Sequence, residues 1–133
     1  MPRMAVIVEW IDEPHIAQIT YQGMIRVDDV VRGWEAVEKL YRHSETHPFC
    51  LLMQVLPDRE LPTGLLKLAT HPATKFLKPI DAASIAGVDH FLMGILTELL
   101  SRLDFSPQIK QAGSYNEALT YLQQVVRAQQ AGL

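Results

Sequence analysis

The sequence contains a single cysteine, Cys50, among its 133 residues. One cysteine excludes an internal disulfide and is typical of a protein from a reducing compartment. Cys50 lies in the apolar segment Phe49–Met53. A free cysteine in such a setting is more often a small buried hydrophobic residue than a reactive thiol. We therefore expect Cys50 to be buried and inert.

Long apolar runs are also missing. No segment approaches the about 18 consecutive apolar residues that a helix needs to cross a bilayer. The apolar stretch near the start of the sequence, Met4–Val8, stops at Glu9 and is too short for a signal peptide. We expect a cytoplasmic protein without a transmembrane segment.

The chain carries little net charge. Its formal net charge is -3 at pH 7, and charged residues make up 20% of the sequence against 48% for hydrophobic residues. An acidic balance does not favour the neutralisation of phosphates, so we expect no nucleic-acid partner. The composition is that of a globular protein, and the length suits one domain with its own core. Without a repeat or a long linker, residues 1–133 are predicted to form a single domain.

Two short apolar segments in the second half of the chain are each followed at once by an amphipathic helix. Ala82–Val88 has small side chains and predicts a buried strand, after which Phe91–Leu103 shows the apolar spacing of a helix. Gln108–Ala112 predicts another strand, and the capping box Ser114–Glu117 begins the last helix. Strands that alternate with helices need crossover connections, so these strands are predicted to be parallel.

The first half of the chain predicts a β-hairpin, a helix and a central strand. Ala5–Ile11 and His15–Tyr21 are rich in β-branched residues and flank a turn that contains proline. A helix is predicted from an N-cap at Asp28, with its apolar residues on one face: Val30, Val31, Trp34, Val37, Leu40 and Tyr41. Phe49–Leu56 is almost continuously apolar, which suits a central strand covered on both faces. Leu61–Thr70 predicts a further short helix.

Together these elements predict an α/β fold with a mixed central sheet of about five strands, an N-terminal β-hairpin and about four helices. This order of elements resembles the STAS-like superfamily. The segments Ser84–Val88, before a helix, and Gly113–Leu122, at the end, carry the resemblance. More narrowly, the chain is similar to small bacterial STAS-like (SpoIIAA-like) proteins, related in fold to anti-sigma-factor antagonists and CRAL-TRIO lipid-binding domains. The resemblance implies a domain without enzymatic activity that associates with proteins or binds a small or lipidic anion.

In the anti-sigma-factor antagonists, a serine that can be phosphorylated lies in an Asp-Ser-x-Gly-Leu stretch after the third strand. The matching stretch of this chain is Leu61–Leu65, in which Thr63 takes the place of the serine. Pro62 stands where the motif has its aspartate. The resemblance therefore makes Thr63 a candidate phosphorylation site, and the alternative interpretation is a helix N-cap.

The ends of the predicted parallel strands are candidates for ligand binding. Ligands of open α/β sheets bind outside the carboxyl ends of the strands. Asp89 and His90 directly follow one predicted strand, and Asp58, Arg59 and Thr63 follow the preceding one. We predict that these five residues share a ligand-binding rim. In the alternative interpretation Asp89 caps the following helix and His90 is exposed in its first turn.

Motifs for catalysis are missing. A serine nucleophile in a Gly-x-Ser-x-Gly turn does not occur, and Ser84 lies inside a predicted strand, where its hydroxyl is expected to bond a main-chain group. His43 and His47 have a spacing that suits zinc on a helix, but the predicted helix ends there before Pro48. We interpret them as surface histidines. No enzymatic activity, metal or cofactor is expected.

The sequence thus predicts a cytoplasmic regulatory or protein-interaction module that forms a homodimer or binds a regulatory protein. Trp10 and Trp34 are candidate anchors of an interface, with a place in the core as the alternative. The alternative function is a carrier of a small apolar or lipidic ligand. Its pocket would lie between the sheet and the helices, and four residues of the rim would form its mouth: Asp58, Thr63, Asp89 and His90.

Overall fold

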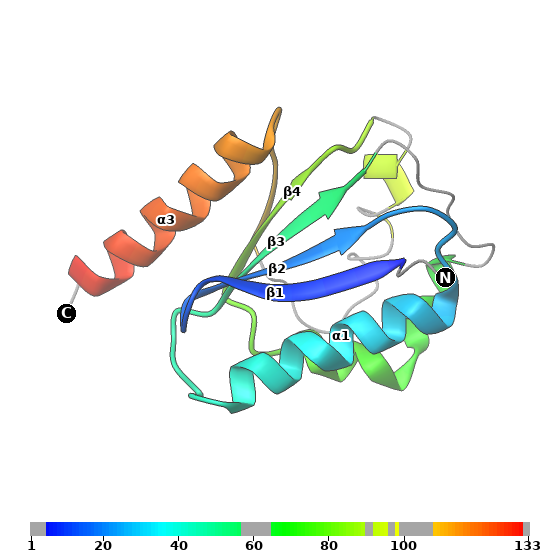
Figure 1. The fold of residues 1–133 in the computed structure, drawn as a ribbon, viewed down its shortest axis with the longest axis horizontal. Helices are drawn as coiled ribbons and strands as arrows, with labels where there is room; N and C mark the ends of the chain where they lie inside the picture. Colours follow the sequence, from blue (N-terminus) through cyan, green and yellow to red (C-terminus); the bar gives the residue numbers. More distant parts are fainter. Residues whose placement is uncertain (1–4, 57–64, 90–91, 96–97, 99–107, 132–133) are drawn as a thin grey trace.

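The computed structural model describes residues 5–56, 65–89, 92–95, 98 and 108–131, and these residues have an α/β fold built on one mixed sheet (Figure 1). The strands lie in the order of the sequence: β1 (Val6–Asp12), β2 (Ile16–Tyr21), β3 (Cys50–Val55), β4 (Ala82–Ala86) and β5 (Gln108–Gln111). β1 and β2 form the predicted antiparallel hairpin, and β2 to β5 are parallel. The predicted fold class is confirmed.

Described helices lie on both faces of the sheet. α1 (Val27–Arg42) and two short 3-10 helices, η1 (Leu65–Thr70) and η2 (Pro72–Leu77), lie on one face, while α3 (Tyr115–Ala131) lies on the other (Figure 1). Successive residues of β3 enter these two layers alternately: Cys50 and Leu52 face α3, and Leu51 faces α1. A strand covered in this way is apolar throughout, which explains the continuous run in the sequence.

The apolar face of α1 is the predicted one, but its beginning is not. Asp28 was expected to be the N-cap, and this prediction was wrong, because the helix starts after Arg26. The carboxylate of Asp29 reaches back and accepts a hydrogen bond of 2.9 Å from the Arg26 amide. The residues that face the core are those predicted: Val30, Val31, Trp34, Val37, Leu40 and Tyr41.

The segment before β4 forms two 3-10 helices rather than one α-helix. His71 separates them, and its ring Nδ1 accepts a hydrogen bond of 3.0 Å from the Ala73 amide at the start of η2. Pro72 has no amide hydrogen and fits the first turn of a new helix better than the interior of a continuing one. Of the short helix predicted over Leu61–Thr70, residues 61–64 lie outside the described residues.

The second half of the chain follows the prediction closely. All five residues of β4 are buried between β3 and β5. At the start of α3 the Ser114 hydroxyl accepts a hydrogen bond of 3.2 Å from the Glu117 amide, and the Glu117 carboxylate accepts one of 3.0 Å from the Gly113 amide. Helical residues 92–95 and 98 belong to the helix expected over Phe91–Leu103, and the rest of that range is not described. None of the described helices is long and apolar enough to span a membrane.

Candidate functional site

The parallel pairing of β2, β3 and β4 gives the sheet two different edges. His15, Phe49 and Asp81 immediately precede these three strands and lie at the amino ends. The residues after Tyr21, Val55 and Ala86 lie at the carboxyl ends, at the opposite edge of the sheet. Each edge carries a distinct set of polar groups.

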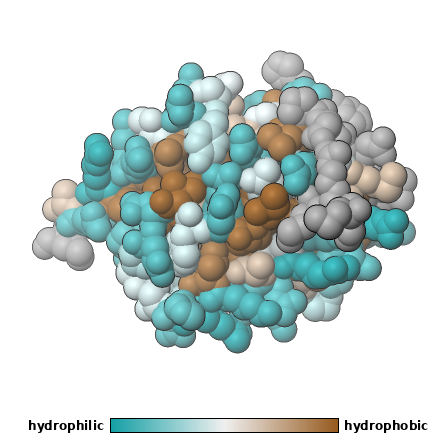
Figure 2. Space-filling view, viewed as in Figure 1, coloured by the Kyte–Doolittle hydropathy of each residue, from teal (hydrophilic) through white to brown (hydrophobic). Residues whose placement is uncertain are grey.

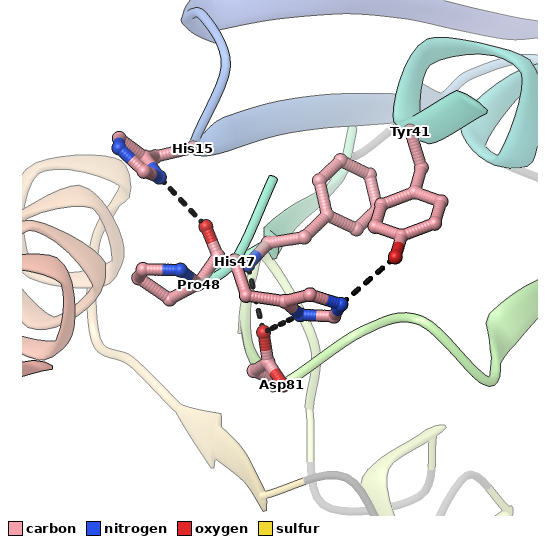
Figure 3. A network of polar contacts seen from close by, with 6 residues as sticks. His15, Tyr41, His47, Pro48 and Asp81 are labelled. Atoms are coloured by element: carbon pink, nitrogen blue, oxygen red, sulfur yellow. Dashed lines mark hydrogen bonds and ion pairs between the residues drawn. The ribbon is translucent and has the colours of Figure 1, made fainter. Parts of the chain in front are cut away.

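At the amino ends, side chains from the end of α1, the loop after it and the residue before β4 form a hydrogen-bonded series, which we call the amino-end network: Tyr41, His47 and Asp81 (Figure 3). Nδ1 of His47 lies 2.7 Å from the Asp81 carboxylate, and Nε2 lies 2.8 Å from the Tyr41 hydroxyl oxygen. The same Asp81 oxygen accepts a hydrogen bond of 2.8 Å from the Phe49 amide.

The fold brings the amino-end network together by placing three element ends beside one another. Tyr41 lies in the last turn of α1, and Asp81 directly precedes β4. The loop that carries His47 is held in place at Pro48, whose carbonyl oxygen lies 2.8 Å from Nδ1 of His15 (Figure 3). Aromatic contacts add to the packing, since the Tyr41 ring lies 5.3 Å from the His47 ring and 5.2 Å from that of Phe49.

The order carboxylate, imidazole and hydroxyl is one that can move a proton. A carboxylate on Nδ1 orients the imidazole and leaves Nε2 to accept a hydrogen bond from the hydroxyl. The His47 side chain is 49% exposed and that of Asp81 33%, so water reaches the pair. An exposed pair of this kind contributes little to stability by charge alone. The main structural effect lies in the bond from the Phe49 amide to Asp81, which fixes the start of β3 to the start of β4.

Sequence reasoning did not find the amino-end network. His47 was grouped with His43 by spacing, whereas in the structure its two ring nitrogens lie beside Tyr41 and Asp81. His43 is exposed, and the His47 side chain is half exposed. Among the described residues, no group of three or more His, Cys, Asp or Glu side chains could hold a metal ion. Asp81 is 34 residues from His47, and no local pattern signals such a pair.

At the carboxyl ends, Asp89 adopts the cap geometry. Its Oδ1 accepts a hydrogen bond of 2.8 Å from the Leu92 amide, and its main-chain carbonyl accepts one of 2.9 Å from the Met93 amide. Asp89 thus begins the helix that follows, as the alternative interpretation had it. The other four residues of the predicted rim lie outside the described residues: Asp58, Arg59, Thr63 and His90.

Gly87 shapes the same edge. It has a φ of +86°, and a Cβ at this position would collide with the main-chain carbonyl oxygen of Val55. The chain leaving β4 therefore passes directly over the end of β3, which only a glycine permits. This close approach places Asp89 beyond the end of the neighbouring strand.

Cys50 is buried as predicted. Its side chain has no exposed surface, and burial, together with the nearby negative charge of Asp81, raises the pKa of its thiol to about 11. A hydrogen bond from the Ala82 amide opposes this shift only in part. At neutral pH the thiol is uncharged, which agrees with the prediction of an inert residue.

A buried polar cluster on the α3 face of the sheet was not foreseen. The side-chain amide nitrogen of Gln18 lies 2.9 Å from the Thr20 hydroxyl and 3.2 Å from the side-chain oxygen of Gln54, and the Tyr115 hydroxyl donates a bond of 2.7 Å to the side-chain oxygen of Gln18. These bonds satisfy polar groups that would otherwise be costly to bury. They also fix the first residue of α3 over β2.

The two tryptophans have different environments. Trp34 belongs to the core under α1, so its expected role as an interface anchor was wrong and the alternative of a core residue holds. Trp10 is half-buried on β1, where its ring meets that of Phe49 edge to face at 6.0 Å. An aromatic ring at the edge strand remains partly open to solvent.

No protein-family model matches the chain, and no curated protein matches it. Among solved structures, the chain is similar to an uncharacterized protein of the DUF3478 family from Shewanella loihica PV-4, described as having a SpoIIAA-like fold. The similarity covers 89% of this chain and 92% of that chain, with a TM-score of 0.61 and 15% sequence identity. The chain therefore has a SpoIIAA-like fold, which confirms the predicted STAS-like resemblance at the level of architecture.

Proposed function

We propose that the chain is a regulatory protein-interaction module without enzymatic activity, built as one domain over residues 1–133, and that it binds a partner protein at the carboxyl ends of the parallel strands. The SpoIIAA-like fold supports the class of function. The predicted rim supplies the polar part of the surface and remains a proposal: Asp58, Arg59, Thr63, Asp89 and His90. Thr63 remains the candidate phosphorylation site.

One observation supports this location. Met24 lies in the segment that leads from β2 to α1, beyond the carboxyl end of β2, and its side chain is 64% exposed. It is the one large hydrophobic side chain with such exposure among the described residues. Methionine is flexible and polarizable, and it is common at surfaces that bind proteins. β2 and β4 are two positions apart, so their carboxyl ends are separated by about 10 Å, and Met24 and Asp89 each lie three residues beyond one of these ends.

The test compares a tagged wild-type chain with Met24→Lys and Gln124→Lys in cells of the source organism. Gln124 is exposed on α3 and serves as the matched control. Bound proteins are quantified by mass spectrometry after chemical cross-linking. We expect Met24→Lys to reduce recovery of the cross-linked partner about tenfold, as for a substitution in the centre of an interface, and Gln124→Lys to leave it unchanged. Equal recovery with all three chains would contradict the proposed surface.

Native mass spectrometry of the purified protein separates this proposal from the carrier function. A mass equal to the chain, or to the chain with a protein partner, supports the interaction module. A fatty acid or phospholipid that stays bound in stoichiometric amount would support the carrier and overturn the proposal.

A further inference from the structure

We propose that β1 is a dimerisation edge, through which two copies of the chain pair antiparallel and join their sheets into one continuous sheet. The inference concerns a different surface from that of the proposed function and does not depend on it. β1 is the outer strand of the sheet and pairs with β2 alone, while α1 runs along β1 in Figure 1 and packs against its Val6 side chain. The second main-chain edge of β1 is not paired with a strand in the described part of the chain.

The register of the hairpin defines which main-chain groups of β1 are outward. The Gln22 amide donates to the Ala5 carbonyl, so Ala5 faces β2. In an antiparallel pair such residues alternate with residues whose amide and carbonyl point away. Ile7 and Glu9 therefore also face β2, and the outward residues are Val6, Val8 and Trp10. No main-chain hydrogen bond joins the outward groups of these three to another described residue.

The outward amides and carbonyls of β1 can pair with the same groups of β1 in a second chain. If Val8 lies opposite Val8 of the second copy, Val6 lies opposite Trp10 at both ends. Each such pair exchanges two hydrogen bonds, so the interface forms about six bonds related by a two-fold axis. The β-bulge between Trp10 and Asp12 ends the regular edge, so a shifted register would form fewer pairs.

Charge placement agrees with this register. Glu9 is the one charged residue within Val6–Ile11. In the proposed register Glu9 lies opposite Ile7 of the second copy and not opposite another Glu9, so like charges are not paired. Isolated sheets usually protect an edge with lysine, proline, an inward-pointing charge or a β-bulge. Val6–Trp10 contains no lysine or proline, and the bulge of β1 lies only after Trp10.

The side chains of the edge have apolar surface left to bury. Val6, Val8 and Trp10 pack against the core under α1 but are only partly buried, and Ile7 and Ile11 are partly exposed on the other face. Figure 2, in the same orientation as Figure 1, shows apolar side chains among polar ones in the middle of this view, over the region where Figure 1 places the sheet. The pair formed by Val6 and Trp10 of the second copy would be of the aromatic and β-branched kind that stabilises antiparallel sheets.

The first test measures the mass of the full chain in solution by light scattering over a roughly hundredfold range of concentration. We expect wild type to approach twice the mass of the chain and Val8→Pro to remain at the mass of one chain. Proline at position 8 removes an outward amide, so the bonds between β1 and β2 persist. A wild-type chain that stays monomeric throughout would overturn the proposal.

The second test uses cysteine variants and does not depend on the folding of the proline variant. In the proposed register the Cα atoms of the two residues 8 are about 5.5 Å apart, within the range of a disulfide. The two residues 6 are four positions out of register and about 14 Å apart. We expect Val8→Cys to form a disulfide-linked dimer under mild oxidation and the matched control Val6→Cys to form none. The native Cys50 is buried and does not compete. Equal linkage of both variants, or linkage of neither, would contradict this interface.

Discussion

The Ser84 hydroxyl donates a hydrogen bond of 3.0 Å to the main-chain carbonyl oxygen of Ala118, joining the middle of β4 to the first turn of α3. Both residues are completely buried, and Ser84 is the polar member of an otherwise apolar strand. The bond satisfies a hydroxyl that could find no water in this position. It also sets the position of α3 along the sheet.

Replacement of Ser84 with alanine is expected to lower the free energy of unfolding by about 1–2 kcal/mol, because a buried hydrogen bond is lost without much change in packing volume. Urea denaturation followed by circular dichroism measures the change. Ser44→Ala, at an exposed position, is the control and is expected to change stability by less than about 0.5 kcal/mol. Equal effects of the two substitutions would contradict the role assigned to the bond.

Replacement of Gly87 and of Gly94 with alanine is expected to change the stability of the protein in opposite directions. Gly87→Ala places a Cβ against the Val55 carbonyl at a positive φ, and we expect it to cost at least about 2 kcal/mol. Gly94 is helical, and a Cβ at this position would meet open space, so Gly94→Ala is expected to stabilise the protein by up to about 1 kcal/mol. Thermal unfolding compares them. A neutral Gly87→Ala would show that the end of β3 can move aside.

The amino-end network is expected to respond unequally to the loss of its members. Asp81→Ala removes the acceptor of the Phe49 amide at the start of a buried strand, and a loss of about 1–3 kcal/mol is expected. His47→Ala removes an exposed partner, and a loss below about 1 kcal/mol is expected. Chemical denaturation of both variants and of the double variant gives the coupling between them. A larger loss for His47→Ala would reverse the assignment of the main structural role to Asp81.

The buried thiol of Cys50 is expected to make stability fall in alkaline solution. Its pKa is raised from 9.0 to about 11 in the folded chain, so folding favours the protonated form. This contribution is fully present below pH 9.0 and is lost as the pH rises through about 11, with a magnitude of roughly 2–3 kcal/mol. Cys50→Ala should show a smaller decrease over the same interval, because its unfolded state has no thiol to ionise.

A reagent specific for thiolates provides an independent measurement on the same residue. At pH 8 the folded chain is expected to react at least about a hundredfold more slowly than the chain unfolded in urea, because the thiol is both buried and protonated. Fast reaction of the folded chain would show that the start of β3 opens readily.

Local patterns were sufficient for much of this fold. Ala82–Ala86 is buried and parallel because small apolar residues followed by a helix signal leave few other arrangements. The capping bonds at the start of α3 join residues only three and four positions apart. The error at Asp28 has a local cause as well. Asp28 and Asp29 are adjacent acidic residues near the start of the helix. Either carboxylate can accept a hydrogen bond from a free main-chain amide there, so the sequence alone does not distinguish them.

The amino-end network and the buried cluster around Gln18 needed the tertiary structure. Their members are separated by as many as 97 residues along the chain, as in the bond between Tyr115 and Gln18, and no periodicity links residues so far apart. The sequence by itself determined which segments are strands and helices, because apolar spacing and caps act within a few residues. Only the folded sheet decided which polar side chains meet, because strand order and register bring distant segments within hydrogen-bonding distance.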